Sequence, residues 1–259
     1  MFKRKLRSFG KKVGTFATFL FPDRYFLVNC YGGKIYLNLK ESEMMIRRSL
    51  GIYEYWKTKL FFQLVKSNMI VVDVGANKGY FSLLSAKLMS DKGRVLAFEP
   101  YPNNCYWLQN SIQANRYRSI TLFPFALSNL EGKKKFYVGK YSGSGSFFHS
   151  DNTTNKKFFV KCRKLDNVLE ENAIDHVDLL KIDVQGADLE VLEGAKKTLS
   201  QQNLKIVMDI DVSKEKKEVL LDYIQSFGFK LFTIDKKPQP ITVLNNECIT
   251  EVFASKSGA

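Results

Sequence analysis

The segment 70–79, with the sequence IVVDVGANKG, combines residue types that form a ligand-binding turn. An apolar run ends on Asp73, and Gly75 and Gly79 follow four residues apart. Glycines leave backbone N–H groups and Cα atoms uncovered, so a ligand can lie directly against the chain. Because the spacing differs from the GxGxxG pattern of dinucleotide-binding turns, a pyrophosphate is the less favoured ligand. The Asp73 carboxylate instead suits a ligand with positive charge, such as an ammonium or a sulfonium group.

A second acid, Glu99, ends the apolar run RVLAFEP, 26 residues after Asp73. A carboxylate at the end of the second strand of such a sheet can accept hydrogen bonds from both hydroxyls of a ribose. Pro100 then turns the chain away from the strand. A single acid of this kind is more often a surface residue at a strand end, but together with Asp73 and its glycines it indicates a nucleoside site.

Three further acids lie at the ends of later apolar runs. Asp183 ends LLKID just before Gly186, and Asp209 and Asp211 follow IVM two residues apart. If the strand continues, Asp209 and Asp211 share one face. Together the three can orient a substrate hydroxyl, act as a general base or bind a divalent ion, although nothing else in the sequence supports a metal. The alternative is that these acids cap the adjacent helices.

The chain has only two histidines, which excludes a histidine-rich metal site. His149 lies in the Gly/Ser-rich stretch YSGSGSFFHS, where it can meet a substrate, although a lone histidine is more often incidental. His176 precedes a predicted strand, where we expect a structural role.

Apolar runs that alternate with helical segments must position these side chains. Runs of four to six apolar residues between helices are typical of a parallel sheet with both faces covered, so the sequence predicts a doubly wound α/β fold. The last two strands should form an antiparallel hairpin at one edge. We expect strands at 69–74, 94–99, 120–127, 177–184, 204–210, 230–234 and 249–255, and helices at 80–89, 103–115, 187–199 and 214–227.

Two segments lie outside this alternation. Residues 1–67 are expected to form a basic N-terminal arm and a small cap, in which 32–40 alternates as a strand does. Residues 68–259 then form the main domain. The segment of about 131–165 is a basic, strand-rich insert at the carboxyl edge of the sheet, where a substrate lid is expected, although a tolerated surface loop is the alternative.

The formal net charge of +14 is concentrated in two segments of the chain. Residues 1–12 carry six basic residues and no acid, and residues 133–164 carry nine basic residues and one acid. These two segments account for the whole excess, which favours an anionic partner over general solubility. The candidates are a membrane surface, an anionic glycan or nucleic acid; solvated tails and loops are the alternative.

The N-terminus resembles a targeting segment, because a basic stretch precedes the nine-residue apolar run VGTFATFLF. This run is too short to span a bilayer and lacks a small-residue cleavage site. An amphipathic arm on an anionic membrane surface is the better functional interpretation. The four cysteines are far apart, without a CxxC pair, so we expect a reducing, cytoplasmic setting with peripheral membrane contact.

Several ordered motifs together resemble the FkbM family of S-adenosylmethionine-dependent methyltransferases. They are VVDVGANKGYFSLLSAKLMSDKGRVLAFEPYPNN, PFALSN, KLDNVL and VDLLKIDVQGADLEVLEGA. The resemblance covers roughly residues 51–253 and implies a Rossmann-like, class I methyltransferase fold with a seven-stranded sheet. It implies the following contacts with the cofactor: Asp73, Gly75, Ala76, Asn77 and Gly79 at the methionine part, Glu99 and Pro100 at the ribose, and Ala126 and Leu127 at the adenine. The segment GIYE also resembles a family segment, which places Glu54 near the cofactor.

The sequence departs from the family pattern Asp-Val-Glu-Gly-Ala-Glu, because Gln185 and Asp188 replace the two glutamates. Its fifth strand also ends on Asp209, where the family tends to have glutamate. Gln185 removes one carboxylate from the reaction side. Asp183 remains, and we assign it the role of general base.

The resemblance implies O-methylation of a saccharide, glycolipid or related natural product. Asp209, Asp211 and His149 are the candidate substrate contacts, and the expected acceptor carries a hydroxyl, with an anionic glycan or glycolipid among the candidates. One alternative is a non-catalytic cofactor-binding or membrane-associated module, which Gln185 motivates. A nucleic-acid methyltransferase is less favoured, because the chain lacks the Asn/Asp-Pro-Pro-Tyr/Phe signature of base amino-group methylation.

Overall fold

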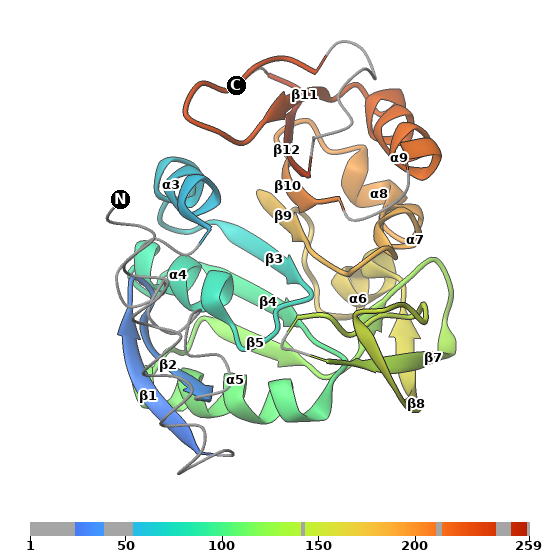
Figure 1. The fold of residues 1–259 in the computed structure, drawn as a ribbon. Helices are drawn as coiled ribbons and strands as arrows, with labels where there is room; N and C mark the ends of the chain where they lie inside the picture. The colour runs from blue at the N-terminus through green and yellow to red at the C-terminus, as the bar shows by residue number, and fades with distance from the viewer. Residues whose placement is uncertain (1–23, 39–53, 141–142, 211–213, 242–249, 258–259) are drawn as a thin grey trace, which may run out of the picture.

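The computed structural model describes residues 24–38, 54–140, 143–210, 214–241 and 250–257 (Figure 1). The basic arm at residues 1–12 and the candidate substrate residue Asp211 therefore lie outside the described residues. No helix within the described ranges is long and apolar enough to cross a lipid bilayer.

A seven-stranded sheet forms the centre of the molecule, in the order β11-β12-β10-β9-β3-β4-β5. The described strand pairs are parallel, except that β12 is antiparallel to both of its neighbours, β10 and β11. The strands are β3 (Ile70–Val74), β4 (Arg94–Phe98), β5 (Ile120–Phe123), β9 (Leu179–Ile182), β10 (Lys205–Asp209), β11 (Lys230–Thr233) and β12 (Glu251–Ser255). The doubly wound, mostly parallel sheet predicted from the sequence is thus confirmed.

The order of strands in the sheet reverses at β3. After β3 the chain adds β4 and β5 on one side of this strand, and it later adds β9 and β10 on the other side. The loops after β3 and β9 therefore diverge, and ligands of open α/β sheets bind at such a switch point.

Helices cover both faces of the sheet (Figure 1). One face packs against α3 (Tyr55–Leu64), α4 (Tyr80–Leu88) and α5 (Pro102–Asn115). The opposite face packs against α6 (Leu165–Glu171), α7 (Asp188–Glu193), α8 (Lys196–Leu199) and α9 (Lys214–Ser226). Successive strand residues alternate between the two layers: Val72 and Val74 join the second cluster, and Val71 joins the first. Because both layers are apolar, the strands appear in the sequence as nearly continuous apolar runs, interrupted in β3 by Asp73 and in β9 by Lys181.

The N-terminal cap contains an antiparallel hairpin of β1 (Tyr25–Cys30) and β2 (Gly33–Asn38). Only the second of these strands was predicted. Ile35 and Leu37 of β2 are fully buried, in the same apolar cluster as Leu83 and Leu84 of α4. The cap hairpin thus shares its core with the first helical layer.

The two strands of the insert, β7 and β8, form a three-stranded sheet together with β6, in the order β6-β8-β7. Its strands are β6 (Ala126–Leu127), β7 (Gly132–Gly139) and β8 (Thr153–Arg163). The prediction of one strand over 120–127 is wrong, because β5 ends at Phe123 and β6 pairs with β8 instead. Pro124 separates the two strands, since it has no N–H group to continue the ladder.

The helix predicted over 187–199 is likewise two helices, α7 and α8. The break lies at Gly194, whose carbonyl oxygen accepts the backbone N–H of Asp166. A Cβ at Gly194 would lie 2.2 Å from the Ser128 carbonyl oxygen, so the insert strand β6 and the helical layer meet here.

Candidate active site

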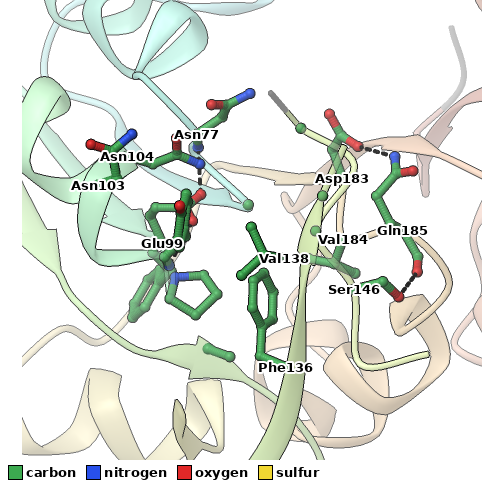
Figure 2. A pocket seen from close by; sticks show the side chains of 18 of the residues that line it. Asn77, Glu99, Asn103, Asn104, Phe136, Val138, Ser146, Asp183, Val184 and Gln185 are labelled. Atoms are coloured by element: carbon green, nitrogen blue, oxygen red, sulfur yellow. Dashed lines mark hydrogen bonds between the residues drawn. The ribbon is translucent and has the colours of Figure 1, made fainter. Parts of the chain in front are cut away.

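A cavity of about 510 Å³ lies at the carboxyl ends of β3, β4 and β9. This volume is within the range of small-molecule sites. Its wall comes from the loop after β3, the end of β4, the β6–β8 insert and the turn after β9 (Figure 2). Residues of the insert therefore line the cavity at the edge of the sheet, and the role of the insert as a lid stays a prediction.

Glu99 follows β4 and is buried in the cavity wall, with only 5% of its surface exposed. Its Oε2 accepts the backbone N–H of Asn77 at 2.8 Å, and its Oε1 accepts that of Tyr101 at 2.8 Å. Burial raises the pKa of the Glu99 carboxyl to about 7, although these hydrogen bonds and one from the Asn104 side chain oppose the rise. A carboxylate has about four acceptor positions, so about one remains for a ligand hydroxyl beside the hydrogen bonds from Asn77, Tyr101 and Asn104.

The loop after β3 is held against both neighbouring strands. The N–H groups of Gly75 and Ala76 both donate to the Phe98 carbonyl oxygen of β4, at 3.0 and 2.9 Å. Gly75 has φ +72°, and a Cβ there would lie 1.9 Å from the Asp183 carbonyl oxygen. Glycine is thus required at position 75 by the close approach of the chain after β9. This approach brings Asp183 to the cavity.

Gly79 has a different role. It is the N-cap residue of α4, with φ +91°, and a Cβ there would lie 2.1 Å from Leu108 Cδ1 of α5. The second glycine of the motif therefore serves packing between the two helices.

Asp73 lies beneath the loop and not on the cavity wall. Its position in β3 directs the side chain toward α4, where Ser82 Oγ donates to its Oδ2 at 2.5 Å. Lys181, its direct partner on β9, places Nζ 3.0 Å from Asp73 Oδ1 and donates to the Gly75 carbonyl oxygen at 3.1 Å. Burial opposes the charge of Lys181, but Asp73 and Asp183 outweigh burial and raise its pKa. Through Lys181, Asp73 supports the loop.

Asp183 lines the cavity on the side opposite Glu99 (Figure 2). Gln185 Nε2 donates to Asp183 Oδ1 at 3.3 Å, and the Lys181 ammonium lies 3.8 Å from Asp183 Oδ2. The Gln185 carbonyl oxygen also accepts a hydrogen bond from Ser146 Oγ of the insert, at 2.8 Å. The cavity thus has a partly exposed carboxylate that an amide and an ammonium hold in place.

Glu54 and Asp209 form a cluster around Lys57 of α3, outside the cavity wall but close enough to interact electrostatically with Asp183. The fully buried Lys57 ammonium lies 2.8 Å from Glu54, 2.5 Å from Asp209 and 3.2 Å from Glu251. Burial opposes its charge, but these carboxylates outweigh burial and raise the pKa of Lys57 well above its ordinary value. The carboxylate oxygens of the three acids lie within 4.8 Å of one another, a spacing that also suits a metal ion. In this structure the ammonium group lies at that position.

The family relationship follows from a match between residues 73–231 and the methyltransferase FkbM domain, over more than half of the chain. The chain belongs to the FkbM methyltransferase family. The matched region is therefore a methyltransferase domain, and use of S-adenosylmethionine is general for domains of this fold. Its seven-stranded sheet is the class I methyltransferase sheet that the sequence motifs implied.

Three similar proteins illustrate the relationship. The hexuronic acid methyltransferase AglP of Haloferax volcanii is 27% identical over 190 residues, which are 73% of this chain and 72% of AglP. The 2-O-methyltransferase NoeI of Sinorhizobium fredii is 27% identical over 154 residues, which are 53% of this chain and 62% of NoeI. The solved structure of methyltransferase FkbM from Methylobacillus flagellatus has the same fold, with a TM-score of 0.54 at 16% identity, over 88% of this chain and 55% of that one. Across the curated relatives that it matches, the chain spans between 11% and 72% of their length.

The cavity at the carboxyl ends of β3, β4 and β9 brings together most of the residues predicted to bind the cofactor. Those that line it are Gly75, Asn77, Glu99, Pro100, Ala126 and Leu127, and the predicted base Asp183 lines it as well. The predicted cofactor contacts Asp73, Ala76, Gly79 and Glu54 lie outside its wall, as does the candidate substrate residue Asp209. The candidate substrate residue His149 is exposed, near Asn155, and does not line the cavity.

The wall of this cavity also includes residues that the sequence analysis did not select. Asn103 and Asn104 begin α5 beside Glu99 (Figure 2), and their position directly after Glu-Pro-Tyr-Pro was a usable signal. Phe136 and Val138 alternate along β7, as expected for one face of a strand. Tyr25 and Asn38, which are paired at the open end of the cap hairpin, also line the cavity. For these two no local signal exists, because the packing of the hairpin on α5 brings them there.

Proposed function

We propose that this methyltransferase transfers the methyl group of S-adenosylmethionine to a hydroxyl group of a saccharide, glycolipid or related natural product. The observation that carries the proposal is the placement of Glu99 and Asp183 on opposite walls of one cavity. Glu99 can accept a hydrogen bond from a ribose hydroxyl at its remaining acceptor position. Asp183 then faces the reacting end of the cofactor and the acceptor.

Bound S-adenosylmethionine supplies an already activated methyl group, so the protein's task is to align the acceptor oxygen with the methyl carbon and the sulfur. Asp183 Oδ2 is the proposed base that receives the hydroxyl proton as the new O–CH₃ bond forms. Gln185 Nε2, on the other oxygen, keeps the carboxylate turned toward the cavity. Phe136 and Val138 of the insert exclude water from this space.

Two observations support a sugar acceptor that carries an acidic group. The family relatives include a protein named for a hexuronic acid and one named for 2-O-methylation. The cavity wall also contains the cationic side chains of Lys78 and Lys140. Lys140 lies on the insert, within reach of an acceptor that enters under the lid. We include no metal in the proposed reaction, because the three-carboxylate cluster holds Lys57.

The test combines cofactor binding with methyl transfer. Calorimetry should show S-adenosylmethionine binding to the wild type and to Asp183→Asn, and much weaker binding to Glu99→Gln. Isotope-labelled methyl transfer to a panel of uronic acid and neutral glycosides should give product with the wild type and none with Asp183→Asn. Failure of the wild type to bind S-adenosylmethionine, or full turnover by Asp183→Asn, would contradict the assignment.

A second candidate is a cofactor-binding module without catalysis, which Gln185 favours because it replaces a family carboxylate. In that case Gln185→Glu should bring no product from the glycoside panel while cofactor binding persists. If the wild type is an enzyme, it should itself give product from the panel at saturating S-adenosylmethionine. The presence or absence of turnover by the wild type with cofactor bound therefore distinguishes the candidates.

A further inference from the structure

The hairpin of β7 and β8 has two faces of opposite chemistry, at the margin of the molecule (Figure 1). One face carries Phe136 and Val138 and lines the cavity. The residues of the other face alternate with these, and the strand register places them opposite one another. We call this the outer face; it consists of Lys133 opposite Lys161, Lys135 opposite Phe159 and Tyr137 opposite Lys157.

Phe159 lies in the middle of the outer face with 68% of its surface exposed. No other large hydrophobic residue in the described part of the chain is exposed to this extent. Its position on β8 is flanked by Lys157 and Lys161 and faces Lys135 across the ladder. A single exposed hydrophobic residue is common on protein surfaces, so the ring is informative only together with the four ammonium groups around it.

The four lysines of the outer face are exposed, and none lies within ion-pair distance of a carboxylate in the described ranges. On the opposite face, by contrast, Lys134 is bound to Glu190. The acids at the base of the hairpin, Glu131 and Glu171, are both held by Arg163. The outer face therefore keeps its positive charge.

This arrangement weakens the hairpin itself. Lys133 and Lys161 are direct cross-strand partners, and like charges directly opposite one another destabilise a sheet. Lysines on β7 have an ordinary explanation, because β7 is an edge strand and charge on an edge prevents aggregation. It covers Lys157 and Lys161 as well, because β6 pairs with β8 only at Cys162 and Arg163, which leaves the rest of β8 with β7 as its neighbour. It does not explain the exposed ring of Phe159 in the middle of the four lysines.

We propose that the outer face of the β7–β8 hairpin docks on an anionic lipid surface. The lysines bind lipid phosphates, and the ring of Phe159 enters the boundary between headgroups and acyl chains. Ammonium groups are compact point charges that suit a diffuse anionic surface, whereas fixed phosphate recognition favours guanidinium forks. A single aromatic residue also provides no stacking platform for successive nucleotide bases. The docked hairpin would hold its other face, the cavity wall, beside a membrane-bound acceptor.

The first experiment measures binding of the full-length protein to vesicles of phosphatidylcholine with about 30% phosphatidylglycerol, at about 0.1 M salt. Replacing Lys133, Lys135, Lys157 and Lys161 by Gln should weaken binding by about tenfold or more. The matched control replaces four exposed lysines elsewhere, Lys66, Lys87, Lys92 and Lys196, by Gln. This control removes the same charge and should retain most of the binding. Equal binding by the outer-face variant and the wild type would overturn the proposal, as would equal losses in the two variants.

A second measurement tests the ring directly. In Phe159→Trp, the added indole emission should shift to the blue on vesicles and be quenched by lipids brominated on the acyl chains. Phe159→Ser should reduce vesicle binding without changing thermal unfolding. Absence of quenching, or binding of single-stranded RNA that is tighter than vesicle binding and is lost in the outer-face variant, would assign the face to another partner. Neither measurement depends on methyl transfer, so the result stands apart from the proposed reaction.

Discussion

The proposed contact of the Glu99 carboxyl group with the ribose predicts that cofactor affinity depends on pH near neutrality. The ordinary pKa of this carboxyl group is 4.5, and burial raises this to about 7. Ribose hydroxyls donate hydrogen bonds, and an ionised carboxylate accepts them best. Binding is therefore coupled to loss of the Glu99 proton: affinity is complete above a pH of about 7 and declines as the pH falls below it.

We expect the dissociation constant for S-adenosylmethionine to rise about tenfold between pH 8 and pH 6. Calorimetry in two buffers of different ionisation enthalpy should also detect proton release at the lower pH. Glu99→Gln should bind weakly at pH 8 and show little change down to pH 6. An equally steep dependence in this variant would place the titrating group elsewhere.

At the level of elements, β3 and β9 are joined by the buried ion pair of Asp73 and Lys181. Removing one partner of such a pair leaves an uncompensated buried charge, which typically costs about 3–5 kcal/mol. Asp73→Asn should lower the free energy of unfolding by about this amount, measured by urea denaturation. The double variant Asp73→Leu with Lys181→Met should recover most of the loss, because an apolar pair can replace a buried ion pair.

The same double variant tests the support that Lys181 gives to the loop. It removes the hydrogen bond from Lys181 to the Gly75 carbonyl oxygen, so a stable double variant should bind S-adenosylmethionine more weakly than the wild type. Undiminished binding by a variant of normal stability would contradict this support. Direct contact of Asp73 with the cofactor would require the loop to move, since Asp73 lies outside the cavity wall.

The loop after β3 depends on Gly75 for a second reason. Gly75→Ala should destabilise the protein and abolish cofactor binding, because the new Cβ would lie 1.9 Å from the Asp183 carbonyl oxygen. Gly228→Ala is the matched control, since Gly228 also has a positive φ of 86° but no atom within 4 Å of the added Cβ. The control should lose only the roughly 1 kcal/mol of left-handed strain. Similar losses of stability for the two variants would contradict the importance of this contact.

The strands of the main sheet were predictable because their apolar runs end on acids at one edge. Glu99 and Asp183 follow their strands and face the cavity, as the sequence indicated. The orientation of Asp73 was not predictable, because it depends on the partner that its side chain finds in the folded sheet. That partner, Lys181, lies 108 residues later along the chain. The boundary between β5 and β6, by contrast, has a local signal in Pro124, since proline interrupts a ladder.

At the level of the whole molecule, Lys57 connects three parts of the chain that are distant in sequence. Its ammonium joins Glu54 before α3, Asp209 at the end of β10 and Glu251 at the start of β12. Lys57→Met should lower the free energy of unfolding by about 3–5 kcal/mol, because three partly buried carboxylates lose their counter-charge. Thermal unfolding with and without about 5 mM Mg²⁺ measures this loss of stability and its response to the metal ion.

Added Mg²⁺ should partly restore the stability of Lys57→Met, because the three acids offer oxygens within 4.8 Å of one another. The wild type should not respond, since its own ammonium holds these oxygens. Glu251→Gln in addition to Lys57→Met removes one ligand and should abolish the recovery. Equal stabilisation of the wild type by Mg²⁺ would contradict this account.

The position of β12 between β10 and β11 has a consequence for synthesis. When β11 leaves the ribosome, the neighbour it needs in the sheet has not yet been translated. Until β12 is translated, one edge of β10 lacks its strand partner, and Lys57 lacks its ion pair with Glu251. The nascent chain can therefore complete its sheet only after Ser255 emerges, which makes stalled or prematurely terminated products targets for chaperones and proteases.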